Sequence, residues 1–248
     1  MVDHELIRAV FGIIANVISI GLFASAVPTF YRAVKRRGSV EDINPYYYLA
    51  MTFNCLFFVL YGLPFINPGN FLLLTAYGTG FIIHIAYLAI FLLYASSRQR
   101  MYVVSVFLTG FLVIGLFFGL VIGLGHTFES RSRPFGLVCI FIGSFMFLPR
   151  ARLTLQVMIT KSVECMPFLI ALSDTLNGLC WCIYAALGSD PYLMTPNGNG
   201  LALGLYQLIL YCVYRSSSTS KVCDDEELAE SADKELGQTE HDKELAQA

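Results

Sequence analysis

Long apolar stretches separated by short polar connections run through most of the chain. Seven of them have the roughly 20 residues that an α-helix needs to cross about 30 Å of hydrocarbon. They lie at residues 7–30, 46–65, 71–94, 102–124, 135–158, 167–187 and 198–214. The fifth is the least uniform, because Arg150 and Arg152 stand near its end. This pattern predicts an all-α membrane protein with seven transmembrane helices.

The sequence also contains a duplication. Ser39-Val40-Glu41, followed by Pro45, returns as Ser162-Val163-Glu164, followed by Pro167. The other corresponding positions are Asn54 and Asn177, Phe58 and Trp181, Tyr61 and Tyr184, and the strings Tyr77-Gly78-Thr79-Gly80 and Asn197-Gly198-Asn199-Gly200. A membrane protein built twice from one unit usually has its working site between the copies, near the bilayer midplane. Transport is therefore the leading hypothesis.

The duplication predicts the domain organisation. The first three spans form one three-helix repeat, residues 1–94, and the last three form the second, residues 135–215. The fourth span and its flanking loops, residues 95–134, have no counterpart. One unpaired span between the copies gives both the same orientation across the bilayer, so we expect a parallel 3+1+3 repeat. Residues 216–248 follow as a tail.

Charge is distributed unevenly along the chain. Ten of the 18 acidic residues follow Val222, in a segment without aromatic residues, which is typical of a disordered tail. Basic residues gather in the connections after the first, third, fifth and seventh spans, whereas the other side holds only Arg8, Arg131 and Arg133. The positive-inside rule places the first set, and with it the C-terminal tail, in the cytosol.

The composition excludes several classes of protein. With 56% hydrophobic residues and a mean hydropathy of +0.63, the chain is too apolar for a soluble domain. A net charge of −2 gives no general attraction to nucleic acid. The seven cysteines are scattered, and we expect no disulfide framework, no metal site and no cofactor. No nucleophile–base set is visible on the predicted helices, so we expect no enzyme.

Several short strings resemble the SWEET family, particularly its plant members, over residues 7–215. They are Pro28-Thr29-Phe30, Asn54-Cys55, Tyr61-Gly62-Leu63-Pro64, Lys161-Ser162-Val163-Glu164-Cys165-Met166-Pro167, Trp181, Pro196-Asn197-Gly198 and Gln207-Leu208-Ile209-Leu210-Tyr211. The resemblance implies bidirectional facilitated transport, or uniport, of sugars by alternating access. We expect hexoses such as glucose, with sucrose as the alternative. The expected partners are the sugar, membrane lipid and a homo- or hetero-oligomer with relatives, in the plasma membrane or, alternatively, the vacuolar membrane.

One face of the sixth predicted span carries the side chains that a sugar pocket needs. Asp174, Asn177, Trp181 and Tyr184 follow one another at helical spacing. Sugar hydroxyls need amide or hydroxyl partners, and the C–H faces of the ring need an aromatic plate. The resemblance implies that Trp181, the only tryptophan, stacks on the sugar; the alternative is that it packs between helices.

The Asn197 amide can form hydrogen bonds with neighbouring helices or with a ligand hydroxyl, and the same resemblance implies that it is the sugar-binding amide of the second repeat. Phe58 is either the opposing plate or pocket filling. Asn54 and Asn177 either contact the sugar or form hydrogen bonds between helices.

The resemblance further implies two moving parts. Tyr61 and Asp190 are expected to form an extracellular gate with Tyr184 nearby, although Asp190 can also be a solvated loop acid. A cytosolic hinge is expected to be made by four prolines, because proline removes a backbone donor and lets a helix bend. These are Pro28, Pro45, Pro149 and Pro167.

The chain departs from the family pattern at several positions. Tyr77 stands where the second sugar-binding amide is expected, which narrows the pocket, shifts the specificity or blocks binding. Ala26, Tyr47 and Arg150 stand where the family has hinge prolines. These departures motivate one alternative function, a transport-impaired partner that assembles with active homologues.

Two ionisable residues within the predicted spans motivate another alternative. Asp174 and His84 are costly in a membrane unless they are paired or hydrated. One interpretation is that Asp174 lies near enough to the cytosolic end to be hydrated and that His84 forms a hydrogen bond with a neighbouring helix. The two residues are the features that favour a proton-coupled carrier of the PQ-loop type, in which protonation accompanies transport.

Overall fold

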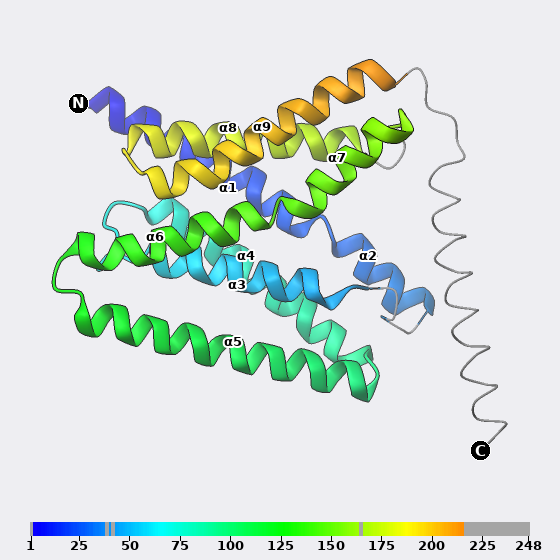
Figure 1. Ribbon diagram of the computed structural model, residues 1–248, viewed down its shortest axis with the longest axis horizontal. Helices are drawn as coiled ribbons and strands as arrows, with labels where there is room; N and C mark the ends of the chain where they lie inside the picture. The colour runs from blue at the N-terminus through cyan, green and yellow to red at the C-terminus, as the bar shows by residue number, and fades with distance from the viewer. Residues whose placement is uncertain (1, 38–39, 41–42, 164–165, 216–248) are drawn as a thin grey trace. The chain divides into compact units, whose positions relative to one another are not determined.

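A computed structural model describes residues 2–37, 40, 43–163 and 166–215 (Figure 1). Within these ranges the chain is helical, with short turns between the helices and no strand. The predicted tail at 216–248 and part of each repeated Ser-Val-Glu string, namely Ser39, Glu41 and Glu164, lie outside the described residues.

The helices follow one another in the order shown in Figure 1. Their bounds are α1 Val2–Ala24, α2 Val27–Arg32, a π-helical turn Ala33–Arg37, α3 Pro45–Tyr61, α4 Phe71–Tyr94, α5 Ser97–Leu124, α6 Phe128–Phe145, α7 Leu148–Thr160, α8 Phe168–Leu187 and α9 Pro191–Tyr214. The all-helical prediction is confirmed, and the third predicted span coincides with α4.

Two of the predicted spans each comprise two consecutive helices. The segment predicted at 7–30 is interrupted at Ser25 and Ala26, and the segment predicted at 135–158 is interrupted at Met146 and Phe147. Hydropathy could not reveal these breaks, because the residues around each break are themselves mostly apolar. The last span begins at Pro191 rather than at 198, since Asp190 caps the helix earlier than the apolar run begins.

Among the residues that the structure describes, five helical segments are long and apolar enough to cross a membrane. They are Asp3–Lys35, Phe71–Tyr94, Ser97–Leu124, Phe128–Thr160 and Phe168–Leu187. The exposed residues Leu108, Leu112, Leu116 and Leu120 repeat every four positions on α5, as expected for a face turned toward lipid. An all-helical membrane fold follows from these segments.

The chain divides into two compact units, which are described separately. The larger comprises Met1–Leu148 and Ser173–Leu203, and the smaller comprises Pro149–Leu172 and Gly204–Ala248. In the larger unit, α3 packs on α4 and α6, and α4 also packs on α1. Its core contains the fully buried Trp181, Phe58 and Tyr61, which belong to α8 and α3.

In the smaller unit, polar groups join α7 to α9 beside an apolar cluster. Gln207 accepts a hydrogen bond from Nη2 of Arg150 at 2.9 Å and donates to Oγ1 of Thr154 at 2.8 Å. Val157 and Leu210 are buried nearby with Val163 and Met166. Arg150, which stands at an expected proline position, therefore makes an interhelical hydrogen bond.

The four predicted hinge prolines share one property, because each lies at or beside the start of a helix. Pro28 and Pro149 are the second residues of α2 and α7, Pro45 is the first residue of α3, and Pro167 immediately precedes α8. Proline is tolerated there because the first turn of a helix has no internal partners for its N–H groups. Asn44 completes the start of α3 by accepting a hydrogen bond from the Tyr46 amide at 3.0 Å.

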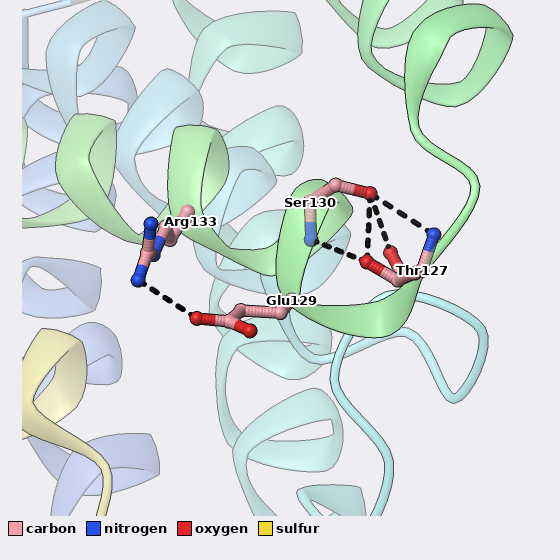
Figure 2. Close-up of polar contacts among 4 residues, drawn as sticks. All are labelled: Thr127, Glu129, Ser130 and Arg133. Atoms are coloured by element: carbon pink, nitrogen blue, oxygen red, sulfur yellow. Dashed lines mark hydrogen bonds and ion pairs between the residues drawn. The ribbon is translucent and has the colours of Figure 1, made fainter.

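The start of α6 is fixed by a different arrangement, shown in Figure 2. Thr127 and Ser130 form a capping box, in which each side chain bonds the other residue's amide at 3.0–3.1 Å. One turn further on, Arg133 and Glu129 form an ion pair at 2.7 Å with both side chains more than half exposed. Exposed ion pairs of this kind contribute little stability. This end of α6 is therefore polar and accessible.

Candidate substrate pocket and gate

Three aromatic residues from three helices meet in the core of the larger unit. The rings of Phe58 on α3 and Tyr77 on α4 are stacked, with centroids 4.3 Å apart and planes inclined by 17°. Tyr77 also contacts Trp181 on α8, at 6.2 Å between centroids. We call these three residues the aromatic cluster. The structure brings together the three rings that the sequence assigned to substrate binding, and the Tyr77 ring contacts both of the others.

The indole N–H of Trp181 already has a partner. It donates to Oγ of Ser19 at 3.0 Å, and Ser19 donates in turn to Oδ1 of Asn177 at 2.8 Å. This chain of hydrogen bonds ties α8 to α1 and fixes the plane of the indole. The face of Trp181, rather than its N–H, is therefore the part that can serve a ligand. Ser19 was not predicted as a site residue. The signal in the sequence was a single hydroxyl side chain in an otherwise apolar helix.

The side-chain amides of Asn197 and Asn54 differ in their hydrogen bonding. Asn197 donates from Nδ2 to the carbonyl of Leu193, one turn earlier in α9, at 2.8 Å. Asn54 is buried, and its Oδ1 has no hydrogen-bond partner among the described residues. A buried acceptor without a partner is costly. Asn54 therefore offers an unused acceptor on α3, four residues before Phe58.

A second group of polar residues surrounds Asp190, at the start of α9. Oδ1 of Asp190 accepts from the Tyr61 hydroxyl at 2.7 Å and from the amides of Tyr192 and Leu193, both at 3.1 Å. Oδ2 accepts from Nδ2 of Asn67 at 3.2 Å and of Asn70 at 3.4 Å. The carboxylate thus caps α9, where the helix dipole favours negative charge. With 7% exposure it is no solvated loop acid, so that alternative was wrong.

The Asp190 cluster, as we call this group, also includes Tyr184 and Arg8. The Tyr184 hydroxyl donates to Oδ1 of Asn70 at 3.3 Å and to the carbonyl of Gly69 at 3.4 Å. Gly69 has a φ of +86°, which glycine adopts without strain. Arg8 donates from Nη2 to Oδ1 of Asn70 at 2.9 Å and lies 4.5 Å above the Tyr184 ring.

Arg8, Asn67 and Asn70 were not predicted to belong to this site. The available signals were the scarcity of arginine on one predicted side of the membrane and the turn-forming string Asn67-Pro68-Gly69-Asn70. Neither signal identifies a contact with Asp190. The predicted gate residues Tyr61, Asp190 and Tyr184 do meet in one cluster.

The two ionisable residues of the proton-coupled alternative lie in different surroundings. Asp174, on α8, is half-buried. His84 is 2% exposed, its two ring nitrogens have no partner among the described residues, and its ring packs against Phe23 and Tyr87 at 5.6 and 5.8 Å. Within the described part of the chain, no three His, Cys, Asp or Glu side chains gather as a metal site would require.

Long apolar helices with buried aromatic rings and neutral amides between them define a multi-pass membrane protein. A family described as "Sugar efflux transporter for intercellular exchange" matches residues 9–99 and 133–219. The chain belongs to this family, and the resemblance noted from the sequence is confirmed.

Relatives with curated names support the same assignment. The chain is 40% identical over 215 residues to "Bidirectional sugar transporter SWEET7b" of Oryza sativa subsp. japonica, covering 86% of this chain and 80% of that one. It is 41% identical to "Bidirectional sugar transporter SWEET7" of Arabidopsis thaliana, covering 86% and 83%. It also resembles the 3.7 Å structure of a eukaryotic SWEET transporter, with a TM-score of 0.81 and 30% identity over 86% of this chain and 99% of that chain.

Proposed function

We propose that this chain carries sugars in both directions across a membrane by facilitated diffusion, without coupling to an ion. The names of its relatives support bidirectional sugar transport. The observation that carries the proposal is the aromatic cluster beside neutral amides, since rings cover the C–H faces of a sugar and amides bind its hydroxyls. Hexoses such as glucose are the proposed substrates, with sucrose as the alternative.

Individual residues take separate roles in this pocket. Trp181 and Phe58 are the proposed plates, with Tyr77 beside them. Asn54 is the proposed acceptor for a sugar hydroxyl, because its Oδ1 is buried without a partner among the described residues. Asn197 supplies its remaining amide oxygen, and Asn177 acts by fixing Trp181 through Ser19.

The proposed architecture is a parallel 3+1+3 repeat with seven spans. Both family matches, residues 9–99 and 133–219, exclude the segment 100–132, which contains most of α5. This gap supports two repeats around an unpaired helix, with the repeats at 1–94 and 135–215. On this layout α1 and α2 form one interrupted span, as do α6 and α7.

The Asp190 cluster is the proposed extracellular gate. Tyr61 lies at the end of α3 and Asp190 at the start of α9, so their 2.7 Å hydrogen bond joins two helices at one end of the pocket. We infer that this bond is made when the protein opens toward the cytosol and broken when it opens outward. The helix-start prolines Pro28, Pro45, Pro149 and Pro167 are the proposed hinge on the cytosolic side.

Location and assembly complete the proposal. The basic residues after the first, third, fifth and seventh spans favour a cytosolic C-terminus by the positive-inside rule. We propose the plasma membrane, with the vacuolar membrane as the alternative, and association with further copies or with relatives.

One observation favours the transport-impaired alternative. The Tyr77 ring stacks directly on Phe58 and contacts Trp181, so it takes up space beside the proposed plates. A chain that retained the fold and lost the pocket would show this arrangement. Such a chain would act by assembling with active relatives.

Counterflow of labelled glucose and sucrose into proteoliposomes, without any ion or pH gradient, separates these functions. We expect wild-type exchange of glucose, and Tyr77→Asn shows whether the ring limits it. Exchange recovered only in Tyr77→Asn would establish the impaired alternative. Uptake by the wild type that appears only with an imposed pH gradient would establish the proton-coupled one.

A further inference from the structure

Arg8 on α1 is connected to Asp190 through hydrogen bonds to one intervening side chain, that of Asn70. Nη2 of Arg8 donates to Oδ1 of Asn70 at 2.9 Å, and Nδ2 of the same amide donates to Oδ2 of Asp190 at 3.4 Å. Asn70 is buried, so its amide has little freedom to find other partners. The three residues form a relay from a guanidinium to a carboxylate.

The direction of the Asn70 amide depends on its donors. Both Arg8 and the Tyr184 hydroxyl donate to Oδ1, which leaves the NH₂ group to face Asp190. An amide turned the other way would point its oxygen at a carboxylate, which is repulsive. The guanidinium makes the stronger of these two hydrogen bonds, because charge-assisted bonds are shorter and stronger than neutral ones. Arg8 therefore decides which end of the Asn70 side chain meets the carboxylate.

The charge of Arg8 has a second effect. Asp190 is buried, and the donors that contact it are two backbone amides, two side-chain amides and a phenol, all of them neutral. A buried carboxylate is stabilised by a nearby cation, and in a low-dielectric setting the effect extends beyond direct contact. The Arg8 guanidinium lies over the Tyr184 ring, 4.5 Å from its centroid. It also lies against Gly188, where a larger residue would leave no room for it.

We propose that Arg8 is a positioning residue of the gate, acting through Asn70 on Asp190. This inference rests on the proposed function, in which the Tyr61–Asp190 bond closes the extracellular side. Arg8 ties the N-terminal part of α1 to the closed arrangement, so opening requires the Arg8–Asn70 bond to break as well. Removal of Arg8 shifts the equilibrium toward the outward-open arrangement.

The single tryptophan makes this proposal measurable without any sugar. Trp181 lies in the core of the same unit and has no exposed surface while the Tyr61–Asp190 bond is made, so acrylamide quenches its fluorescence when that bond breaks and the extracellular side opens. Losing one charge-assisted hydrogen bond changes the ratio of outward-open to closed protein by roughly tenfold. We therefore expect Arg8→Gln to raise the acrylamide quenching constant of Trp181 at least about twofold. Arg8→Lys keeps the positive charge and loses the planar guanidinium group. Its quenching constant is expected to lie between those of the wild type and Arg8→Gln.

Two further variants keep the test decisive if Arg8→Gln does not fold. A Cβ at Gly188 would lie 2.7 Å from Nη2 of Arg8, so Gly188→Ala displaces the guanidinium and leaves Arg8 in the chain. It is expected to raise quenching as Arg8→Gln does. Arg133→Gln is the matched control, since it removes an exposed, ion-paired arginine (Figure 2) and is expected to leave quenching unchanged.

A double-mutant cycle with Asp190→Asn identifies the path of the effect. If Arg8 acts on the carboxylate, Arg8→Gln adds little quenching once residue 190 is neutral. Additive effects of the two substitutions, or no change in Arg8→Gln, Arg8→Lys and Gly188→Ala, would overturn the proposal. Absence of sugar exchange by the wild type would overturn the proposed function and leave the quenching result interpretable.

Discussion

Tyr61 and Asp190, which lie 129 positions apart in the chain, are joined by a 2.7 Å hydrogen bond between the phenol and Oδ1 of the carboxylate. The same oxygen caps α9 through the amides of Tyr192 and Leu193. The Asp190 carboxylate therefore stabilises both the first turn of α9 and the contact of α9 with α3. The two features can be separated by substitution.

Replacing each partner in turn distinguishes the cap from the contact. Tyr61→Phe removes only the hydroxyl and leaves the α9 cap, so it should destabilise the protein by about 1 kcal/mol. Asp190→Ala removes the cap, for which about 1 kcal/mol is typical. It also leaves the buried Tyr61 hydroxyl unsatisfied, which adds about 1–3 kcal/mol.

Thermal unfolding in detergent micelles measures the difference between these variants. Asp190→Asn is the control for Asp190→Ala, because an asparagine oxygen can still accept from the backbone of α9. We expect the smallest decrease in melting temperature for Tyr61→Phe, a larger decrease for Asp190→Asn and the largest for Asp190→Ala. Equal losses for Tyr61→Phe and Asp190→Ala would mean that the cap contributes nothing.

The hydrogen bond from Trp181 to Ser19 leads to a second prediction. In Ser19→Ala the indole N–H loses its partner in a fully buried position, which should cost about 1–3 kcal/mol. The indole should also report this change directly, with an emission maximum shifted to shorter wavelength as its hydrogen bond is lost. Fluorescence and thermal unfolding of the purified protein measure both effects.

Ser19→Thr is the matched control for this prediction. It keeps a hydroxyl within reach of both Trp181 and Asn177, so we expect an emission maximum close to that of the wild type. An unshifted spectrum in Ser19→Ala would show that the N–H finds another acceptor.

Much of the fold followed from the sequence, because apolar runs of membrane length leave few alternatives to helices. The positions of α4 and α8 agree closely with the predicted spans at 71–94 and 167–187. The interruptions at Ser25–Ala26 and Met146–Phe147 did not follow. Hydropathy records whether a residue is apolar and does not record where the backbone bends.

The candidate site followed from the sequence where the residues are duplicated or, as for Asp190, where the family resemblance assigns them. The correspondence of Phe58 with Trp181 and of Tyr61 with Tyr184 identified rings that the structure brings into two clusters. Ser19, Asn70 and Arg8 are not among the duplicated strings that the sequence analysis identified. They belong to the site through contacts with residues 62 to 162 positions away, which a pattern of local spacing cannot contain.

Tyr77 should determine the size of the accepted sugar. Its ring stacks on Phe58 at 4.3 Å, and replacing it with an amide removes the ring and opens space beside both plates. We therefore expect Tyr77→Asn to raise sucrose counterflow relative to glucose counterflow, by at least about tenfold if the ring excludes the second sugar unit by steric contact.

Tyr77→Phe separates the ring from its hydroxyl. It keeps the stack on Phe58, so the ratio of sucrose to glucose exchange should stay near that of the wild type. A ratio in Tyr77→Phe that matches Tyr77→Asn would show that the hydroxyl, rather than the bulk of the ring, sets the preference.

His84 provides a prediction that also tests the proton-coupled alternative. Its imidazole is buried among Phe23, Tyr48 and Tyr87, and neither ring nitrogen has a partner among the described residues. Removing an unsatisfied buried polar group is stabilising when the replacement has a similar shape, so His84→Phe should gain about 1 kcal/mol or more. The melting temperature in detergent should rise accordingly.

A neighbouring aromatic residue supplies the control with the opposite sign. The Tyr87 hydroxyl donates to the carbonyl of Phe23 at 3.1 Å, so Tyr87→Phe should lower the melting temperature, since it removes a made hydrogen bond. In a uniporter, His84→Phe should exchange glucose at the wild-type rate with and without a pH gradient. Loss of exchange in a stable His84→Phe protein would assign the imidazole a role in transport, and loss of a pH-driven component alone would favour the coupled carrier.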